Sequence, residues 1–488
     1  MKLPELGVGV IFTPALEPFL TSGTDLVGVV EVEPQTLWLS FPGQTGVQEH
    51  DSDIAAQLAR LPQPKLVHGV GFPVGGSRTP DPVGVEAFAR TICDLEAPWA
   101  SEHLGFNRAV GPDGEFVTGF LLPPQQDAAG VEAAVRSIRS VASRLPVPFA
   151  VETGVNYLAP RRGELSDGKF VAKVAEGADC GILLDLHNVW TNERNGRQSV
   201  DAFLAEIPLE RVWEVHVAGG LERDGFWLDA HSGDVPDEVL EIASRVLPQL
   251  PNVRAMIFEI LSPYLPRLGA DGVEKQLERL WRLWDSRKRR RGSPGIEVIA
   301  PVQRATGRAP DDSIPPRDPA EWENTLGSLV VGQEVDGGLA EELRRDPGIA
   351  VLRSLVRDAR AGSLADALPS TCRLLVLALG GDGARNLMER YFETSPPRLF
   401  GSEEALAFGD YLDTSPPEVP RLGEVLAFEL ATIRVAVDGR PEVVRLGCNP
   451  QALFAALLEG RLPDDLPAAE FEIEITPDGE TVGIEAAV

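Results

Sequence analysis

Gly181-Ile-Leu-Leu-Asp185 is a short apolar run that ends in a carboxylate, and helix-like stretches flank it. Seven further runs of this kind, rich in apolar and β-branched residues, are spread over residues 1–285. They are Leu6–Phe12, Leu26–Val32, Lys65–Val70, Trp99–Leu104, Pro148–Glu152, Arg211–Val217 and Arg254–Ile260. Eight alternations of strand and helix are typical of a (β/α)8 barrel. The sequence therefore predicts an α/β protein that begins with a TIM barrel.

Two amphipathic segments between these runs carry a helical pattern. In Val131–Leu145, apolar residues recur at about helical spacing, and Pro236–Leu247 begins behind Asp234, which we expect to be its N-cap. Both segments are predicted to be helices that cover the barrel.

A domain boundary is predicted behind the barrel. The basic run Arg287–Arg291 precedes Gly292-Ser-Pro-Gly, and a Pro-rich segment follows at 314–319. This composition predicts a barrel domain over residues 1–285, a linker over 286–318 and a second domain over 319–488. The basic run itself is expected to be a solvated helix end, with a contact for an acidic peptide as the alternative.

The second domain is predicted to be smaller and of the α+β class. Its first part has mainly helical patterning, whereas Phe471-Glu-Ile-Glu-Ile-Thr, the turn at 477–479 and Thr481-Val-Gly-Ile-Glu are typical of a C-terminal β-hairpin.

Charge and cysteine content restrict the partners and the compartment. The 488-residue chain has 45 Lys and Arg against 74 Asp and Glu, so its formal net charge is −29. Such a chain repels polyphosphates and anionic lipid, which disfavours nucleic acid and membrane as partners. The four cysteines lie far apart, and we read neither a signal peptide nor a membrane-spanning run. The expected location is the cytoplasm.

Most predicted strands end in a side chain that can bind a metal ion. The carboxyl ends of parallel barrel strands meet on one face, where active sites of this architecture lie. The side chains that end the strands are Glu31, His68, His103, Glu152, Asp185, His216 and Glu259, and Asp229 and His231 follow the seventh strand. So many carboxylates repel one another unless cations neutralise them. Mixed imidazole and carboxylate ligands suit Fe, Mn or Zn, and their number predicts two or three ions.

Three positions stay open on this reasoning. Glu31 is the weakest candidate because Glu33 follows it and either can be structural. His187 and Asn188, just past Asp185, can ligate a metal or merely orient a ligand.

Several spaced motifs of the barrel resemble the multinuclear non-heme iron-dependent oxidative enzymes, the family that includes the methanobactin-biosynthesis oxygenase. The motifs are Lys65-Leu-Val-His-Gly-Val-Gly, Ser101-Glu-His-Leu, Val151-Glu152, Leu183-Leu-Asp-Leu-His-Asn188-Val, Val215-His-Val-Ala-Gly219 and Leu228-Asp-Ala-His-Ser-Gly233. They cover roughly residues 5–285. The resemblance implies a barrel that holds two or three iron ions, Fe(II) or Fe(III), and uses dioxygen to modify a residue, often cysteine, in a ribosomally made precursor peptide.

The resemblance also implies a ligand set. The implied catalytic and metal-binding residues are His68, His103, Glu152, Asp185, His216, Asp229, His231 and Glu259, with Asn188 as a further ligand candidate. This chain departs from the family pattern in three places. It has Glu31-Val-Glu33 where the family has Glu-x-His, His187-Asn188 where it has Asn-Asn, and Asp229-Ala-His-Ser where it has Asp-Thr-His-Gly.

The region from about Pro319 resembles, more weakly, the separate partner protein that presents the peptide to these enzymes. The similar segments are Tyr391-Phe-Glu-Thr-Ser-Pro-Pro and Ser402-Glu-Glu-Ala-Leu-Ala-Phe408. The resemblance implies a fused peptide-recognition domain, so that a separate partner protein is unnecessary.

Two other functions remain as alternatives. A divalent-metal sugar isomerase or phosphoesterase on a similar barrel would need a hydride-shift lysine or a phosphate-binding basic cluster at the carboxyl ends of the strands, and we find neither there. A peptide-binding scaffold with a degenerate barrel would not need the full set of ligands.

Overall fold

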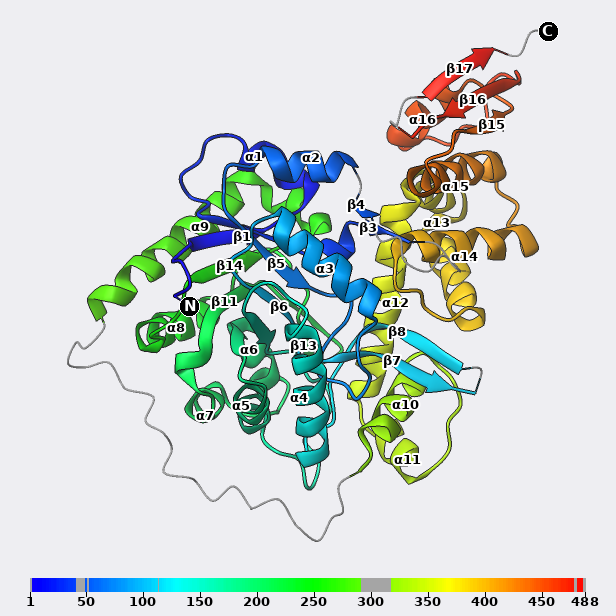
Figure 1. Ribbon diagram of the computed structural model, residues 1–488. Helices are drawn as coiled ribbons and strands as arrows, with labels where there is room; N and C mark the ends of the chain where they lie inside the picture. The colour runs from blue at the N-terminus through cyan, green and yellow to red at the C-terminus, as the bar shows by residue number, and fades with distance from the viewer. Residues whose placement is uncertain are drawn as a thin grey trace.

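Eight parallel strands form a closed barrel in the computed structural model, which describes residues 2–40, 49–50, 52–112, 114–290, 317–477 and 481–485. The strands follow one another around the barrel in chain order, and β1 closes it by pairing with both β2 and β14 (Figure 1). They are β1 (Gly7–Ile11), β2 (Val29–Val32), β5 (Lys65–Gly69), β6 (Ala100–His103), β9 (Phe149–Glu152), β10 (Gly181–Asp185), β11 (Val212–Ala218) and β14 (Ala255–Glu259). Each of the eight predicted runs matches one strand, and only β11 extends beyond its run, by one residue. The TIM barrel is therefore confirmed.

Helices surround the barrel because each strand is buried on both faces and its outer face needs an apolar cover. They are α1 (Glu17–Leu20), α2 (Ser52–Arg60), α3 (Pro82–Asp94), α4 (Ala128–Ala142), α5 (Asp167–Ala178), α6 (Leu186–Arg194), α7 (Val200–Glu206), α8 (Asp237–Val246) and α9 (Leu265–Arg290). In α4, Ala134, Ile138 and Val141 are buried, which confirms the predicted helical face.

The predicted cap of α8 is wrong. The N-cap is Pro236, which offers no side-chain hydrogen bond. The Asp234 carboxylate instead accepts a hydrogen bond from Gln276 of α9, at 2.5 Å. Local spacing assigned the Asp234 side chain to the cap, but this side chain binds a residue of a distant helix instead.

Three hairpins precede the C-terminal region among the described residues, in addition to the barrel strands. They are β3 (Trp38–Leu39) with β4 (Glu49–His50), β7 (Phe106–Gly111) with β8 (Gly114–Leu122), and β12 (Leu221–Arg223) with β13 (Phe226–Leu228). The β7–β8 hairpin directly follows His103, and the β12–β13 hairpin leads into Asp229. Both hairpins therefore frame the face on which the predicted ligands lie.

The C-terminal region, defined here as residues 317–477 and 481–485, is mainly helical and ends in a small sheet (Figure 1). Its helices are α10 (Pro319–Val330), α11 (Gly338–Arg344), α12 (Gly348–Ala367), α13 (Pro369–Thr394), α14 (Gly401–Thr414), α15 (Leu422–Asp438) and α16 (Pro450–Leu458). The predicted hairpin is confirmed as β16 (Phe471–Ile475) with β17 (Thr481–Glu485), and β15 (Glu442–Leu446) adds a third, antiparallel strand. Residues 478 and 479 of the predicted turn lie outside the described residues.

The basic run ends helix α9, but its first arginine is not solvated. The Arg287 guanidinium lies 3.6 Å from the ring of Trp284 and pairs with Glu5 at 2.7 Å. Lys288 pairs with the same carboxylate at 2.8 Å. Within the predicted linker, residues up to Arg290 continue this helix, and residues 291–316 lie outside the described residues.

The C-terminal region packs against the barrel beside the β7–β8 hairpin (Figure 1). Trp322 of α10 is buried there: its indole N–H donates to the carbonyl of Pro123 at 3.0 Å, and Arg161 lies over its ring at 3.8 Å. Asp346, just before α12, accepts a hydrogen bond from the backbone N–H of Ala159 at 2.9 Å. The loop that follows β9, residues 153–159, is thus held by the C-terminal region.

Among the described residues, no single helix is long and apolar enough to cross a membrane. Helices α12 and α13 pass that test only when taken together, and a bend of 110° separates them.

Candidate metal centre

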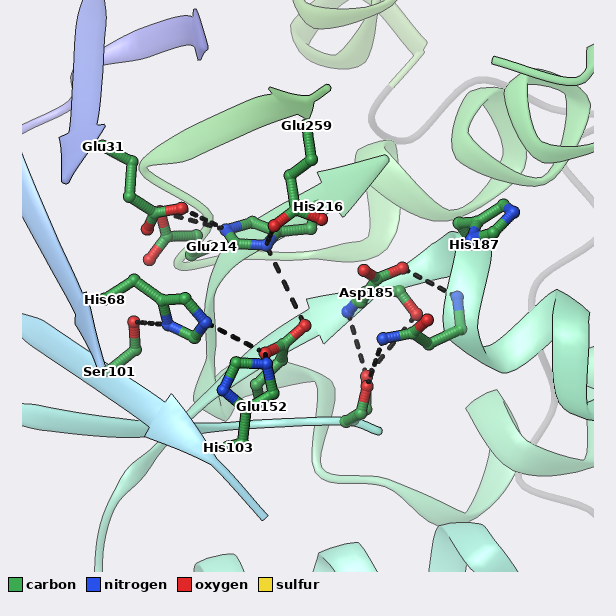
Figure 2. A network of polar contacts seen from close by, with 12 residues as sticks. Glu31, His68, Ser101, His103, Glu152, Asp185, His187, Glu214, His216 and Glu259 are labelled. Atoms are coloured by element: carbon green, nitrogen blue, oxygen red, sulfur yellow. Dashed lines mark hydrogen bonds and ion pairs between the residues drawn. The ribbon is translucent and has the colours of Figure 1, made fainter. Parts of the chain in front are cut away.

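The predicted ligands that lie on the barrel strands converge at the carboxyl ends of these strands, where the strand register turns their side chains inward (Figure 2). Glu152, Asp185, His216 and Glu259 are at most 2 % exposed, and His68 is 1 % exposed. The barrel strands therefore bury a set of ionisable groups that ordinarily lie in water.

The first cluster joins two imidazoles through one carboxylate. The Nε2 atoms of His68 and His103 lie 3.1 and 2.9 Å from the same oxygen, Oε2 of Glu152. The opposite nitrogens are held from outside the cluster: Nδ1 of His68 contacts the Ser101 hydroxyl at 2.8 Å, and Nδ1 of His103 contacts the carbonyl oxygen of Gly69 at 3.0 Å. Both rings thus present Nε2 to a common point.

The second cluster is built around His216. Its Nδ1 lies 3.1 Å from Oε1 of Glu259 and 4.0 Å from Oε1 of Glu152, whereas its Nε2 lies 3.0 Å from Oε1 of Glu31. One ligand atom from each of Glu152, Asp185 and His216 lies within 4.8 Å of the others, and the same holds for Glu31, His216 and Glu259. Because Glu152 belongs to both clusters, the two candidate metal positions are neighbours.

Asp229 and His231 form a third contact at the rim. The Nε2 atom of His231 lies 3.1 Å from Oδ1 of Asp229 and 3.6 Å from Oε2 of Glu259. His231 has a positive φ of 46°, which is rare for a non-glycine residue and marks strain at functional sites. The structure thus places this pair beside the second cluster, outside the groups whose ligand atoms all lie within 4.8 Å of one another.

His187 holds Asp229 from behind. Its Nδ1 lies 3.0 Å from Oδ1 of Asp229, and its Nε2 accepts the indole N–H of Trp227 at 3.0 Å. The hydrogen bond from Trp227 leaves the proton of the neutral ring on Nδ1, so His187 donates to Asp229. His187 therefore orients a predicted ligand, which is one of the two roles that the sequence left open.

Asn188 approaches the clusters through its side-chain oxygen. Its Nδ2 donates to the carbonyl of Thr153 at 3.2 Å, while its buried Oδ1 makes no hydrogen bond among the described residues. An unpaired buried acceptor of this kind fits a weak ligand.

The neighbouring carboxylates raise the pKa values of the imidazoles. Burial alone would lower the pKa of His103, but Glu152 and Glu102 outweigh it and hold the pKa well above its usual value of 6.5. Burial acts in the same direction on the pKa of His216, and Glu259 with Glu31 again raises it well above 6.5. In the absence of a cation, protons on these rings balance the negative charge.

The pKa values of the carboxylates in the clusters are shifted in different directions. Burial raises the pKa of Asp185 well above its usual value, and the charge of Glu259 raises it further. Burial alone would also raise the pKa of Glu152, yet the imidazole of His103 lowers it well below its usual value. Burial raises the pKa of Glu31 to about 7 even though His216 opposes the shift. A divalent cation would relieve this repulsion and replace the bound protons.

The donor atoms themselves fit metal ions. Two buried carboxylate oxygens of the clusters make no hydrogen bond within the described part of the chain, namely Oδ2 of Asp185 and Oε2 of Glu259. Leaving such groups unpaired in a protein interior costs about 1–3 kcal/mol each, and more when they are charged. Imidazole and carboxylate donors directed at common points suit Fe, Mn or Zn.

A cleft of about 100 Å³ opens onto the clusters. His103, Asn188 and Asp229 form its polar side, and Leu121, Val155 and Tyr157 belong to its apolar side. The cleft is therefore of a size and polarity to admit one side chain of a larger substrate.

Sequence reasoning left the role of Glu31 open and missed Glu214 and Trp99. Glu214 precedes His216 by two positions in the same strand, so the alternation of side chains predicts that both face the same way. The indole N–H of Trp99 donates to Glu214 at 2.9 Å. Strand periodicity could have revealed Glu214, whereas no local signal connects Trp99 with it.

Comparison with known proteins now identifies the family. The model of the RiPP precursor modification enzymes MbnB/TglH/ChrH matches residues 8–266, which contain every predicted ligand. RiPPs are ribosomally made, post-translationally modified peptides. The chain belongs to this family.

Two similar curated proteins are UPF0276 proteins. A UPF0276 protein of Streptomyces avermitilis is 30% identical over 253 residues, which are 50% of each chain. The match thus spans about half the length of that relative. A UPF0276 protein of Chromobacterium violaceum is 31% identical over 225 residues, 45% of this chain and 80% of the relative.

Solved structures match the barrel at low scores. D-psicose 3-epimerase from Clostridium cellulolyticum has a TM-score of 0.34 at 12% identity and covers 58% of this chain and 97% of its own. The TTHB071 protein from Thermus thermophilus, soaked with ZnCl2, has a TM-score of 0.34 at 18% identity and covers 57% and 98%. Scores this low carry no argument about activity.

Proposed function

We propose that this protein is an iron- and dioxygen-dependent oxidoreductase that modifies one residue, with cysteine as the first candidate, in a ribosomally made precursor peptide. One observation carries the proposal: one oxygen of Glu152 faces both His68 and His103, and the other faces His216. A carboxylate shared in this way links adjacent metal positions, which a single-ion enzyme does not need. Membership of the RiPP modification family supports a peptide as the substrate.

The ligands divide among two or three ions in this proposal. His68, His103 and Glu152 would hold the first, and Glu152, Asp185, His216 and Glu259 the second. Asp229 and His231, with Asn188 nearby, would hold a third ion or complete the second position. Bound iron would supply electrons for the reduction of dioxygen and a site for a thiolate sulfur.

The protein's own groups would orient the ligands and the substrate. Ser101 and the Gly69 carbonyl fix the rings of His68 and His103, and His187 fixes Asp229. The apolar wall formed by Leu121 and Val155 would exclude water from the reacting side chain.

The C-terminal region would bind the precursor peptide. We propose a barrel domain over residues 1–285, a linker over 286–318 and a recognition domain over 319–488. The sheet β15–β16–β17 has two edge strands, β15 and β17, and an extended peptide can add a strand to such an edge. Fusion raises the effective concentration of a bound peptide at the barrel, so that no separate partner protein is required.

The site favours this function over a sugar isomerase or phosphoesterase. Among the described residues that line the cleft, none is Lys or Arg. Phosphate recognition commonly uses such side chains, and a hydride-shift isomerase of the kind considered above would use a lysine. A cytoplasmic location is part of the proposal, and the four free cysteines are compatible with it.

Anaerobic purification with iron, elemental analysis and electron paramagnetic resonance test the proposal, together with mass spectrometry of a co-expressed precursor encoded near the gene. We expect two or three irons per chain and a mass change that requires dioxygen. Glu274→Gln, at an exposed position of α9, is a control that should behave like the wild type. A protein that holds one zinc and stays inactive with iron and dioxygen would contradict the proposal.

A further inference from the structure

His216 lies between two pairs of carboxylates, one at each ring nitrogen (Figure 2). Glu259 and Glu152 face Nδ1 at 3.1 and 4.0 Å, whereas Glu31 and Glu214 face Nε2 at 3.0 and 3.8 Å. All five side chains are at most 3 % exposed. An ion can therefore reach the imidazole from only one of two opposite sides.

The Nδ1 side offers the richer set of donors. Glu152, Asp185 and Glu259 all lie there, and Glu152 extends from it to the first cluster. On the Nε2 side, one oxygen of Glu214, Oε2, accepts the indole N–H of Trp99 at 2.9 Å. The other oxygen of Glu214 lies 3.8 Å from Nε2, so Glu31, at 3.0 Å, is the nearer carboxylate to the ring. The ion should thus bind Nδ1, and Nε2–H should donate to Glu31.

This arrangement sets His216 apart from the two imidazoles of the first cluster. A neutral hydroxyl from Ser101 holds the outer nitrogen of His68, and the outer nitrogen of His103 is shared between the Gly69 carbonyl at 3.0 Å and Oε1 of Glu102 at 3.3 Å. Of these three imidazoles, His216 has the shortest contact between its outer nitrogen and a carboxylate, 3.0 Å to Glu31. A carboxylate that accepts the outer N–H fixes the tautomer and makes the inner nitrogen a stronger donor.

We infer that Glu31 is a positioning residue for His216, not a metal ligand, and that it makes the metal position at Nδ1 of His216 the most tightly held of the centre. The inference rests on the proposed metal centre, but not on iron, dioxygen or the peptide. The competing assignment makes Glu31 a ligand together with His216 and Glu259, whose ligand atoms also lie within 4.8 Å of one another.

The test uses the full-length, metal-free protein titrated anaerobically with Co²⁺. Competition with a chelator gives the affinity of each position, and proton NMR in water detects the shifted exchangeable N–H of each Co²⁺-bound imidazole. For Glu31→Gln we expect one position to bind Co²⁺ about 10–100-fold more weakly. One shifted N–H signal should move, while those of His68 and His103 stay in place. The number of bound ions at saturation should not change.

If Glu31 had a purely structural role, the Co²⁺ affinity and the N–H signal of the Glu31→Gln variant would differ from these expectations. The amide introduced by Glu31→Gln can still accept a hydrogen bond, so a role limited to holding the ring would leave both the affinity and the N–H signal unchanged, and this result would overturn the inference. Loss of one Co²⁺ at saturation would make Glu31 a ligand and would also overturn it. Ser101→Ala is the matched control, and its effect should be confined to the signal of His68.

A second measurement does not depend on folding of the Glu31 variant. In the wild type labelled with ¹⁵N-histidine, metal binding should perturb Nδ1 of one imidazole and Nε2 of His68 and His103. Binding of every imidazole through Nε2 would refute the inference. If this pattern is found but the iron-loaded enzyme leaves the precursor unmodified with dioxygen, only the proposed function fails.

Discussion

The barrel and the C-terminal region both bury charged side chains, but they satisfy these charges in different ways. In the C-terminal region, Arg360 donates to Glu404 at 2.8 Å, and Glu429 accepts the backbone N–H groups of Ser370 and Thr371 at 2.7 and 2.9 Å. In the barrel, the buried carboxylates of the candidate centre retain oxygens without a hydrogen bond among the described residues. Buried charges whose hydrogen bonds are all made stabilise the fold, whereas buried charges with unpaired atoms remain available to bind a ligand.

The largest effect is expected when the shared carboxylate of the barrel is removed. Glu152→Gln should lower the iron content by more than one ion, because Glu152 faces both clusters. Loss of metal catalysis is worth several kcal/mol, so activity on the precursor should fall by about 10³-fold or more. Elemental analysis and single-turnover mass spectrometry measure the two effects.

Glu404→Gln is the control for that experiment, because Glu404 is an equally buried carboxylate outside the barrel. It should leave the iron content unchanged. If the Glu152→Gln protein kept its full iron content, the buried carboxylates of the barrel would not differ from those of the C-terminal region in their role.

The second effect concerns stability. Glu404→Ala leaves Arg360 buried without its carboxylate partner, and breaking a buried ion pair costs about 3–5 kcal/mol. Chemical denaturation should show this loss in the transition of the C-terminal region, with the iron content unchanged. The double variant Arg360→Met/Glu404→Leu should recover much of the loss, because it leaves no unpaired charge. Failure of Glu404→Ala to destabilise the protein would contradict a structural role for the pair.

The positions of the candidate ligands could be predicted because they depend on local order along the chain. His68, His103 and Asp185 each end an apolar run, and parallel strands bring such ends together on one face. The matched family model covers residues 8–266, the stretch in which these residues lie. Nine residues could thus be assigned to one face without knowledge of any contact.

Contacts across the barrel could not be predicted in the same way. Glu31 lies on β2 and His216 on β11, two strands that do not pair, so their 3.0 Å contact depends on how the closed barrel is filled. The error at Asp234 has the same origin, since its partner Gln276 lies 42 residues away. Strand β15 was missed because the surrounding sequence is helical and its partner β16 follows only after α16.

A third, smaller effect is expected where the two regions meet. Asp346 accepts the N–H of Ala159 and, at 2.9 Å, that of Gly348. Asp346→Ala should destabilise this contact by about 1 kcal/mol and speed hydrogen exchange at Ala159, because one hydrogen bond to the loop after β9 is lost. Asp358→Ala, which removes the exposed pair with Arg223, should not change exchange at Ala159. Equal exchange in both variants would mean that the C-terminal region does not hold this loop.

The smallest effect concerns Glu323, a buried carboxylate of α10 at the boundary between the two regions, which accepts the hydroxyl of Ser77 at 2.6 Å. Burial raises the pKa of Glu323 above its usual 4.5, although the bonds from Ser77 oppose the shift. A raised pKa means that the folded state binds the proton more tightly, so the resulting stabilisation is complete below about pH 4.5 and is lost as the pH rises through the raised pKa.

Glu323→Gln does not titrate. Relative to the wild type, it should therefore gain stability between pH 4 and pH 7, by less than about 1 kcal/mol. Denaturation at both pH values measures this difference, and Glu321→Gln, at an exposed position of the same helix, controls for the lost charge. If the wild type instead gains on the variant as the pH rises, the two bonds from Ser77 outweigh burial, and Glu323 belongs with the fully satisfied carboxylates of the C-terminal region.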